Sequence, residues 1–523
     1  MNKRAQAALA ALICAGIVAC GAQGTADAPL PVAAKVAASY DPLNDPVPRA
    51  VCGPGSQPET DIQGRVPVED RVSGRSQEGY RCNMELESQL QGVGASWQMA
   101  WFEDCVYYGT TFPGAHGVQV LDVSDSKNPK LTATLTTPSM LDPWESLKVN
   151  ERRGLLGADT GWNIGGPAFF DVYDLKSDCA HPQLLSTLPA QAPVGHEGDW
   201  APDGLTYYVG LSPSIIDVTD PAVPKYVPST DNKGSGHGLS VREDGNRMYA
   251  VGASCGNGLK ILDTSQIQAR VLNPQIPVIG EVCWTDGSTA QHTIPVYYDG
   301  KPYVIFVDEM GRGASRIIDI SDETKPVVVS KLKLEIHLPA AADFVAADCQ
   351  GEGSLFCYEA HYCSVDQKIN PTALACGYFN SGLRVFDIRE PLKPREIAYY
   401  NPPAQVGKKA QLTGSEHQNG ALAGAAVTET TADWCSSQPR FVKERGELWA
   451  TCQDNGFMVL KFTNGVWPIE ESAVPAPTTP QAQSASATDS KFGAGSLGFF
   501  LLLPMLGAVR RRSMTKVQYL KRD

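Results

Sequence analysis

The sequence lacks the motifs that would assign a chemistry directly. It has no Gly-Lys-Ser/Thr segment of the kind that cradles phosphate and no Cys-x-x-Cys pair, which argues against a P-loop and against a zinc ribbon. Positive charge is also in short supply, because 44 Lys and Arg stand against 57 Asp and Glu and give a net charge of -13. Since nucleic acids are bound by basic surfaces, we expect no nucleic-acid partner.

A hydrolase signature is missing as well. The segment Gly252-Ala-Ser-Cys-Gly256 matches Gly-x-Ser-x-Gly, but Leu259 to Leu262 favour a strand after it, whereas a nucleophile elbow needs a helix there. We interpret the segment as a hairpin loop. No motif establishes an enzyme, and we therefore expect a non-catalytic protein.

The N-terminal segment is typical of an exported protein. Lys3 and Arg4 precede a short apolar run, and the segment 17–20, which ends at Cys20, resembles a bacterial lipobox, in which the cysteine is lipidated. An ordinary signal peptide cleaved after Cys20 is the alternative. We predict a lipoprotein-type signal peptide over residues 1–20 and a flexible tether over residues 21–60.

The C-terminal segment carries a second candidate targeting signal. Residues 469–492 are rich in Pro, Ala, Ser and Thr and predict a disordered stalk. Residues 493–523 combine small residues, a short apolar run and the arginines 510–512, which resembles the glycine–glycine type sorting signals of Gram-negative surface proteins. A membrane helix with a positive-inside flank is the alternative, although the apolar run is shorter than the ~20 residues of a full span. We therefore expect a terminal membrane anchor and a site at the outer membrane or cell surface.

The cysteines predict disulfides. Of the 14 cysteines, Cys14 and Cys20 lie in the N-terminal segment, and the even number that remains favours disulfides in an exported chain. The candidate pairs are Cys363 with Cys376, Cys435 with Cys452, Cys255 with Cys283 and Cys349 with Cys357.

A repeated segment organises the chain. Residues 117–129 read as a buried strand, an aspartate-marked turn and a proline that opens the next strand. The pattern recurs in six further segments, at residues 168–182, 214–221, 258–274, 315–326, 382–391 and 455–462. The aspartates are more consistent with turn caps than with calcium ligands, because they lack the dense oxygen spacing of a calcium loop.

The repeat length predicts a β-propeller. Units of about 46 residues with four short strands each have the size of a propeller blade, and seven copies predict seven blades over residues 61–468. The third strand of each unit is apolar on both faces, as expected where blades pack face to face. The seventh unit lacks an outer strand, and we expect residues 78–90 to supply it and to close the ring.

The repeats resemble a known family. The runs Val120-Leu-Asp-Val-Ser-Asp125, Ile215-Ile-Asp-Val-Thr-Asp-Pro221 and Ile317-Ile-Asp-Ile-Ser-Asp322 are similar to the LVIVD-repeat family of bacterial surface and exported propellers. The resemblance covers roughly residues 92–465. It implies a propeller outside the cytoplasm and leaves the biochemical role open.

Five of the 8 histidines recur in phase with the repeats. Three of them stand seven residues before an Asp-Gly turn, and two occupy the matching place in the next units, which puts each at the start of an inner strand and near the mouth of the central channel. These are His196, His237, His292, His361 and His417, with Glu197 and Glu416 beside two of them. The same position holds Trp97 and Ser146 in the first two units, and His337 lies outside the register.

These residues allow two interpretations. Imidazole and carboxylate groups together suit a transition metal ion or a small ligand, and selenium-binding propellers also carry histidines near their axis, which is an analogy of architecture only. A structural role at a tight junction is the other interpretation. We therefore expect a surface-displayed propeller that binds an unknown protein or glycan at its top face, with a metal-binding, possible oxidoreductase, propeller as the alternative.

Overall fold

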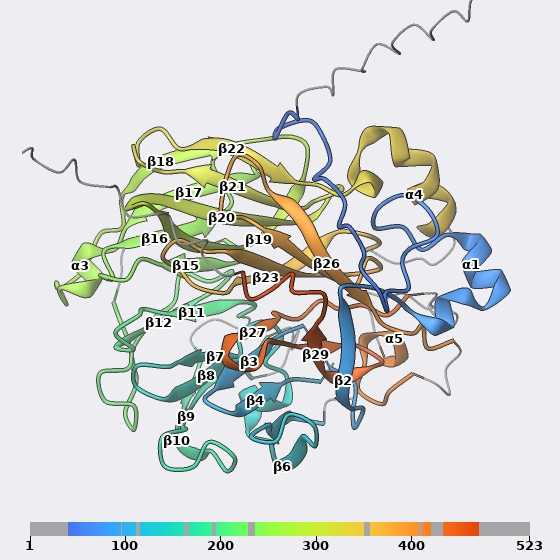
Figure 1. Ribbon diagram of the computed structural model, residues 1–523. Helices are drawn as coiled ribbons and strands as arrows, with labels where there is room; N and C mark the ends of the chain where they lie inside the picture. Colours follow the sequence, from blue (N-terminus) through green and yellow to red (C-terminus); the bar gives the residue numbers. More distant parts are fainter. Residues whose placement is uncertain are drawn as a thin grey trace, which may run out of the picture. The chain divides into compact units, whose positions relative to one another are not determined.

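The protein is a seven-bladed β-propeller. The computed structural model describes residues 40–95, 97–110, 116–161, 167–190, 195–228, 236–349, 356–406, 411–419 and 432–469. Within these ranges the strands form seven antiparallel sheets, six with four strands and one with five (Figure 1). The predicted fold class, an all-β propeller with seven blades, is confirmed.

The first three blades each run outward from an inner strand. Blade 1 contains β3 (Met99–Phe102), β4 (Cys105–Tyr108), β5 (Val118–Asp122) and β6 (Lys130–Leu135). Blade 2 contains β7 (Lys148–Asn150), β8 (Leu155–Asp159), β9 (Phe169–Asp174) and β10 (Gln183–Pro189). Blade 3 contains β11 (Gly198–Trp200), β12 (Thr206–Val209), β13 (Ile215–Asp217) and β14 (Lys225–Tyr226).

Blades 4 to 6 follow the same order. Blade 4 contains β15 (Leu239–Val241), β16 (Arg247–Val251), β17 (Gly258–Asp263) and β18 (Val278–Cys283). Blade 5 contains β19 (Ser288–Tyr298), β20 (Lys301–Met310), β21 (Ser315–Asp319) and β22 (Val327–Leu332). Blade 6 contains β23 (Ala360–Val365), β24 (Ala373–Tyr378), β25 (Leu383–Asp387) and β26 (Arg395–Asn401). The first strands of successive blades contact one another from β3 to β27, which places them around the central axis.

The N-terminal part of the chain closes the ring. Blade 7 contains β27 (Arg440–Val442), β28 (Glu447–Cys452) and β29 (Gly456–Phe462), and its outer strand is β2 (Met84–Leu90). The strand β2 pairs antiparallel with β29, from Met84 opposite Phe462 to Leu90 opposite Phe457. The predicted closure is thus confirmed. The preceding strand β1 (Tyr80–Cys82) adds a fifth strand to blade 6 by pairing with β26, so one short segment ties two blades together.

The repeated aspartate ends the third strand of a blade and caps the turn that follows. In blades 1, 3 and 5 the carboxylate accepts the backbone N–H two residues further on, as Asp122 does from Ser124 at 2.9 Å. In blade 2 this position belongs to Asp174, which lies opposite the first residue of β8 as Asp122 lies opposite the first residue of β4. Asp171, three residues earlier in the segment 168–182, does not cap this turn: it is buried and accepts hydrogen bonds from Thr187 and Ser139.

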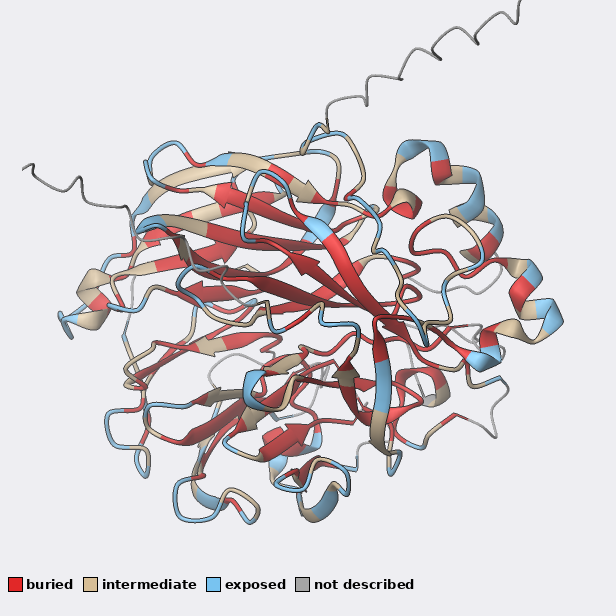
Figure 2. Cartoon of the chain, viewed as in Figure 1, coloured by how far each residue is buried: buried red, intermediate tan, exposed pale blue. Residues whose placement is uncertain are grey.

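Burial follows from the packing of blade against blade. The second and third strands are buried on both faces, whereas the outer strands of blades 1 and 2 are largely exposed or half-buried (Figure 2). The largest apolar cluster lies between blades 5 and 6 and includes Ile305, Ile317, Leu374 and Phe386. Because every blade covers its neighbours, the ring has to be complete for these strands to stay out of water.

The segment before β1 lies along the outer edges of the last blades. The backbone N–H of Val47 donates to the carbonyl oxygen of Lys333, and that of Glu396 donates to Pro48. Val47 is buried, and a disulfide joins Cys52 to Cys82 at the end of β1. Residues 47–52, within the predicted tether, therefore contact blades 5 and 6.

Helices are few and short in the described residues. They are α1 (Val68–Ser73), α2 (Pro138–Leu141), α3 (Ser265–Gln268), α4 (Ala342–Cys349), α5 (Glu416–Asn419), η1 (Arg75–Glu78), η2 (Glu335–His337), η3 (Pro339–Ala341) and η4 (Lys443–Arg445). Over the part of the chain that the structure describes, no helix is long and apolar enough to cross a membrane. The predicted signal peptide, the anchors and nearly all of the stalk lie outside the described residues.

Six disulfides cross-link the described part of the propeller. They include the four predicted pairs, Cys255–Cys283, Cys349–Cys357, Cys363–Cys376 and Cys435–Cys452, and two further pairs, Cys52–Cys82 and Cys105–Cys179. The two further pairs were not predicted: Cys105–Cys179 has a separation of 74 and joins blades 1 and 2, and Cys52–Cys82 joins the segment before β1 to the end of that strand. Several disulfides in one chain are typical of an extracellular or periplasmic protein.

Removing the Cys52–Cys82 disulfide should loosen the ring closure. Replacing both cysteines by alanine releases a loop with a sequence separation of 30 and should lower the free energy of unfolding by about 3–4 kcal/mol. Amide exchange in β29 should accelerate, because β2 would hold it less firmly. The matched control is Cys255→Ala with Cys283→Ala, whose separation of 28 gives a similar loss of stability without faster exchange in β29. Equal exchange in the two variants would contradict this role.

A buried histidine predicts acid sensitivity. His337 accepts the N–H of Leu334 on Nδ1 at 3.1 Å and places Nε2 at 2.8 Å from the carbonyl oxygen of Tyr358, and burial lowers the pKa of His337 to about 3. Only the unfolded chain then binds a proton between the two pKa values, so the free energy of unfolding falls by about 1.4 kcal/mol per unit as pH drops below about 6.5. Between pH 7.5 and pH 5.0, His337→Gln should lose about 2 kcal/mol less than the wild type in urea titrations. Parallel losses would refute this assignment.

Candidate functional site

The loops that lead into the inner strands bring a histidine and carboxylate cluster to the axis. Glu145, His196 and His237 come from the segments just before β7, β11 and β15, while His361 lies on β23 and Glu309 near the end of β20. We call these five residues the axial cluster. Their side chains are 0–13% exposed. Blades 2 to 6 each contribute a residue or a preceding loop, so the cluster depends on the assembled ring.

The carboxylate of Glu145 is the centre of the axial cluster. Its Oε2 lies 3.4 Å from Nε2 of His196 and 3.6 Å from Nε2 of His237, and its Oε1 lies 3.0 Å from Nε2 of His361. Glu309 stands on the other side, 3.3 Å from Nε2 of His361 and 3.7 Å from Nε2 of His237. Two groups of three therefore form, one with Glu145, His196 and His237 and one with Glu145, Glu309 and His361, each with ligand atoms within 4.8 Å of one another.

Backbone carbonyls orient two of the imidazoles. Nδ1 of His361 lies 2.7 Å from the carbonyl oxygen of Ser436, and Nδ1 of His237 lies 3.4 Å from that of Gln291. A proton on Nδ1 satisfies the carbonyl, so Nε2 of each ring can present its lone pair toward Glu145 and Glu309. Histidines that bind metals are usually held in this way by a partner on the second nitrogen.

In the metal-free cluster His361 carries a positive charge beside Glu145 and Glu309. Burial opposes a charge on His361, but Glu145 and Glu309 outweigh it and raise the pKa of His361 to about 10. Despite its own burial, Glu145 has a pKa well below its ordinary value because of His196, His237 and His361. Burial and the charge of His196 lower the pKa of His237. A cation bound by Glu145 and Glu309 would take the place of the proton on Nε2 of His361.

Aromatic side chains cover one flank of the cluster. Trp97, Trp144, Phe356, Phe379 and Trp434 form one buried apolar group. The ring of Trp97 lies 5.4 Å from that of His361, and the indole N–H of Trp144 donates to Nε2 of His196 at 3.1 Å. This contact makes Nε2 of His196 the least available of the imidazole nitrogens, since a metal would have to displace the indole.

His292 and Glu197 lie beside the axial cluster but outside it. His292 sits in β19, where the register shifts between Ala290 and Thr293, so its neighbour Gln291 contacts His361 at 3.1 Å instead. The imidazole of His292 stacks on Tyr362 at 4.6 Å. Glu197 pairs with Lys148 at 3.2 Å and lies 3.9 Å from Nδ1 of His237, and burial raises the pKa of Glu197 to about 8.

His417 and Glu416 lie outside the axial cluster, on the short helix α5. In blade 7 the position two residues before the inner strand, where His196 and His237 stand in blades 3 and 4, is held by Gln438. The helix α5 with His417 lies earlier, in the connection from β26 to β27. Nδ1 of His417 donates to Asp454 at 2.6 Å and lies 3.7 Å from Asp433. Asp433 already accepts the backbone N–H groups of Asp454 and Asn455, so this group acts as a clip that holds α5 on blade 7.

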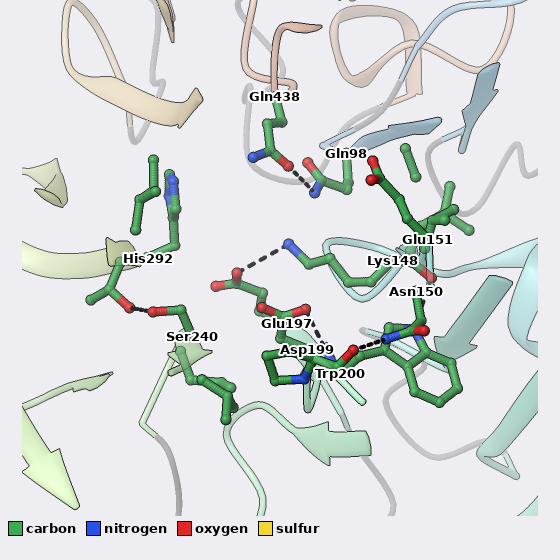
Figure 3. A pocket seen from close by; sticks show the side chains of 18 of the residues that line it. Gln98, Lys148, Asn150, Glu151, Glu197, Asp199, Trp200, Ser240, His292 and Gln438 are labelled. Atoms are coloured by element: carbon green, nitrogen blue, oxygen red, sulfur yellow. Dashed lines mark hydrogen bonds and ion pairs between the residues drawn. The ribbon is translucent and has the colours of Figure 1, made fainter. Parts of the chain in front are cut away.

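A cavity of about 430 Å³ runs along the inner strands. We call it the axial cavity. Its walls include Gln98, Lys148, Glu197, Ser240 and His292, and Figure 3 shows these side chains around a common space. Glu197 belongs to the cavity wall and also approaches His237, so it connects the cavity with the axial cluster.

Three residues of the site, Glu145, Glu309 and Lys148, were not among the site residues predicted from the sequence. Glu309 lies outside the histidine register, on the second strand of blade 5, but the end of a second strand returns to the face where the first strand begins, as Ser288 opposite Met310 shows. Lys148 is the first residue of an inner strand. The available signals were the place of Lys148 at the start of an inner strand and the return of the second strand of blade 5 to the same face.

Comparison with known proteins assigns no family to the chain. No family profile matches the chain, and no curated protein matches it. A functionally unknown protein from Desulfotomaculum acetoxidans is similar over 60% of this chain and 89% of its own, with 14% identity and a TM-score of 0.40. A protein from Bacteroides uniformis named as a "putative 6-phosphogluconolactonase" is similar over 68% of this chain and 92% of its own, with 13% identity and a TM-score of 0.44.

Proposed function

We propose that the protein is a metal-binding propeller that holds one transition metal ion at the axial cluster. The observation that carries the proposal is the common orientation of His237 and His361, whose Nδ1 atoms face backbone carbonyls while their Nε2 atoms face the same two carboxylates. Three imidazoles with one or two carboxylates form a donor set suited to zinc, copper, iron or nickel.

The spacing of the ligand atoms supports this proposal. Metal–nitrogen and metal–oxygen bonds of about 2.0–2.1 Å put neighbouring ligand atoms about 3.0–3.4 Å apart. Within each of the two groups of three the carboxylate–imidazole contacts span 3.0 to 3.6 Å, so shifts of a few tenths of an ångström would bring the members of one group onto one ion. An ion pair of His361 with the two glutamates is the competing account, and it needs neither His196 nor His237.

Metal titration separates the two accounts. Chelator-treated protein should take up one Zn²⁺ or Cu²⁺ per chain, and Cu²⁺ should quench the fluorescence of Trp97 and Trp144, because their rings lie 5.4 and 5.7 Å from those of His361 and His196. Glu145→Gln and His237→Gln should each weaken binding by more than about 100-fold, since partners outside the ligand set alone are worth 10–100-fold.

The chain offers a matched control histidine. His181 is well exposed and pairs only with nearby Asp178, far from the cluster in the fold, so His181→Gln should leave affinity and stoichiometry unchanged. His417→Gln should also retain the ion, because His417 belongs to the clip on α5. No uptake by the wild type, or equal affinity in the Glu145→Gln variant, would rule the axial site out.

We also propose that this propeller is displayed outside the cell as a lipoprotein of the LVIVD-repeat type, where it binds a protein or glycan. The six disulfides support an oxidising location, and the segment ending at Cys20 supports the lipid anchor. A structural metal ion near the top of the channel is compatible with a non-catalytic binding role.

Mass spectrometry of the mature protein tests the anchor. A lipoprotein should begin at Cys20 and carry the added mass of its acyl chains, and Cys20→Ser should release it from the membrane fraction. Removal of residues 493–523 is the parallel test of the sorting signal. An unmodified N-terminus after residue 20 would favour the ordinary signal peptide.

A further inference from the structure

The two glutamates of the axial cluster divide their oxygen atoms between two imidazoles. Oε1 of Glu145 lies 3.0 Å from Nε2 of His361, whereas its Oε2 lies 3.6 Å from Nε2 of His237. Glu309 shows the same division, with Oε1 at 3.3 Å from Nε2 of His361 and Oε2 at 3.7 Å from Nε2 of His237. Each of these imidazole nitrogens therefore faces one oxygen from each glutamate.

This division defines two positions that each offer one nitrogen and two oxygens. The His361 position contains Nε2 of His361 and the Oε1 atoms of both glutamates, and the His237 position contains Nε2 of His237 and the two Oε2 atoms. Nε2 of His196 adds a second nitrogen on the His237 side, at 3.4 Å from Oε2 of Glu145. A carboxylate whose oxygens face different positions can bridge two metal ions, which lie about 3.5–4 Å apart in two-metal sites.

The His237 position contains a buried oxygen without a proton donor. Oε2 of Glu145 has no hydrogen-bond partner among the described residues, although the side chain is only 1% exposed. The neighbouring Nε2 of His196 accepts the indole N–H of Trp144, so it has no proton to offer this oxygen. Because buried polar groups are nearly always paired, the bare oxygen marks a place where a cation is bound.

The His361 position has the spacing of a ligand set. Glu145, Glu309 and His361 are buried, and their ligand atoms lie within 4.8 Å of one another. The two carboxylate–imidazole contacts, at 3.0 and 3.3 Å, match the separation of about 3.0–3.4 Å that bonds of about 2.0–2.1 Å impose on neighbouring ligand atoms. The carbonyl oxygen of Ser436 holds Nδ1 of His361 at 2.7 Å, which directs Nε2 at the glutamates.

We propose that the axial cluster holds two divalent transition metal ions bridged by Glu145 and Glu309, one ion in the His237 position and one in the His361 position. This inference rests on the proposed function, which accounts for the first ion, and adds the second. The first ion takes the His237 position, because His237 and His196 together offer two imidazoles there. The second ion replaces the proton between His361 and the glutamates, and that proton leaves to solvent.

The two ions should bind in sequence. Two dications about 4 Å apart repel each other, and the bridging carboxylates of Glu145 and Glu309 offset part of that repulsion. The second ion is therefore bound more weakly than the first. The single equivalent expected in the metal titration is the tightly bound ion, and the second equivalent enters at higher metal concentration.

Copper titration followed by electron paramagnetic resonance tests the proposal on chelator-treated protein. The first equivalent of Cu²⁺ should give the full signal of one unpaired spin per chain. The second should lower the signal at low temperature and add a half-field line, because two Cu²⁺ ions that share bridging carboxylates couple magnetically.

The other outcomes of this titration separate the two proposals. Saturation at one ion with a full signal would overturn the second ion and leave the proposed function standing, whereas no uptake would remove both. Two ions with the full signal of two uncoupled spins would make the second an adventitious ion elsewhere on the protein, which would also overturn the bridged pair.

Variants assign the second ion to its position. His361→Gln and Glu309→Gln each remove a ligand of the His361 position, so each should take up one ion and lose the coupled signal at every copper concentration. His181→Gln is the matched control and should keep both ions and their coupling, because His181 is exposed and pairs with Asp178. A coupled signal that persists in His361→Gln would contradict the assignment. The wild-type titration decides on its own if a variant fails to fold.

Discussion

The pairing of β2 with β29 is the interaction on which the rest of the structure depends. It joins the first and last parts of the propeller and turns a row of sheets into a ring, in which blade 7 packs against blade 1. The axial cluster exists only in that ring, because Glu145 of one segment has to meet His237, Glu309 and His361 of three others. Closure and function are therefore coupled through geometry, although no residue of β2 touches the cluster.

Polar and charged side chains gather at the propeller axis because the interfaces between the blades are apolar. The faces of each blade pack against the neighbouring blades. The central space is bordered by the inner strands and the loops that precede them. Buried there, Glu145 pairs with His361 and Lys148 pairs with Glu197. A cation at the cluster would replace part of that neutralisation.

Much of the fold was predictable because turn chemistry and strand burial repeat with the blades. The aspartate turns gave the blade count, and the missing outer strand of the seventh unit gave β2 as its replacement. The site was predictable only in outline. His196, His237 and His361 meet as their shared register indicated, whereas a β-bulge diverts His292 and an insertion carries His417 onto α5. Bulges and insertions change spacing by one or many residues without changing composition, and Glu309 reaches the axis from a second strand.

The segment from Tyr80 to Leu90 has a consequence for how the chain reaches its folded state. Within blade 7, Gln89 and Asn455 are hydrogen-bonded although 366 residues separate them along the chain. During synthesis and export the N-terminal strand emerges first, and its partner emerges near the end. Until then β2 is an unpaired edge with a buried-face residue, Met84, that needs cover. β1 can pair with β26 before β29 appears, which would keep the waiting strand beside its future position, and the Cys52–Cys82 disulfide fixes the base of that waiting strand early.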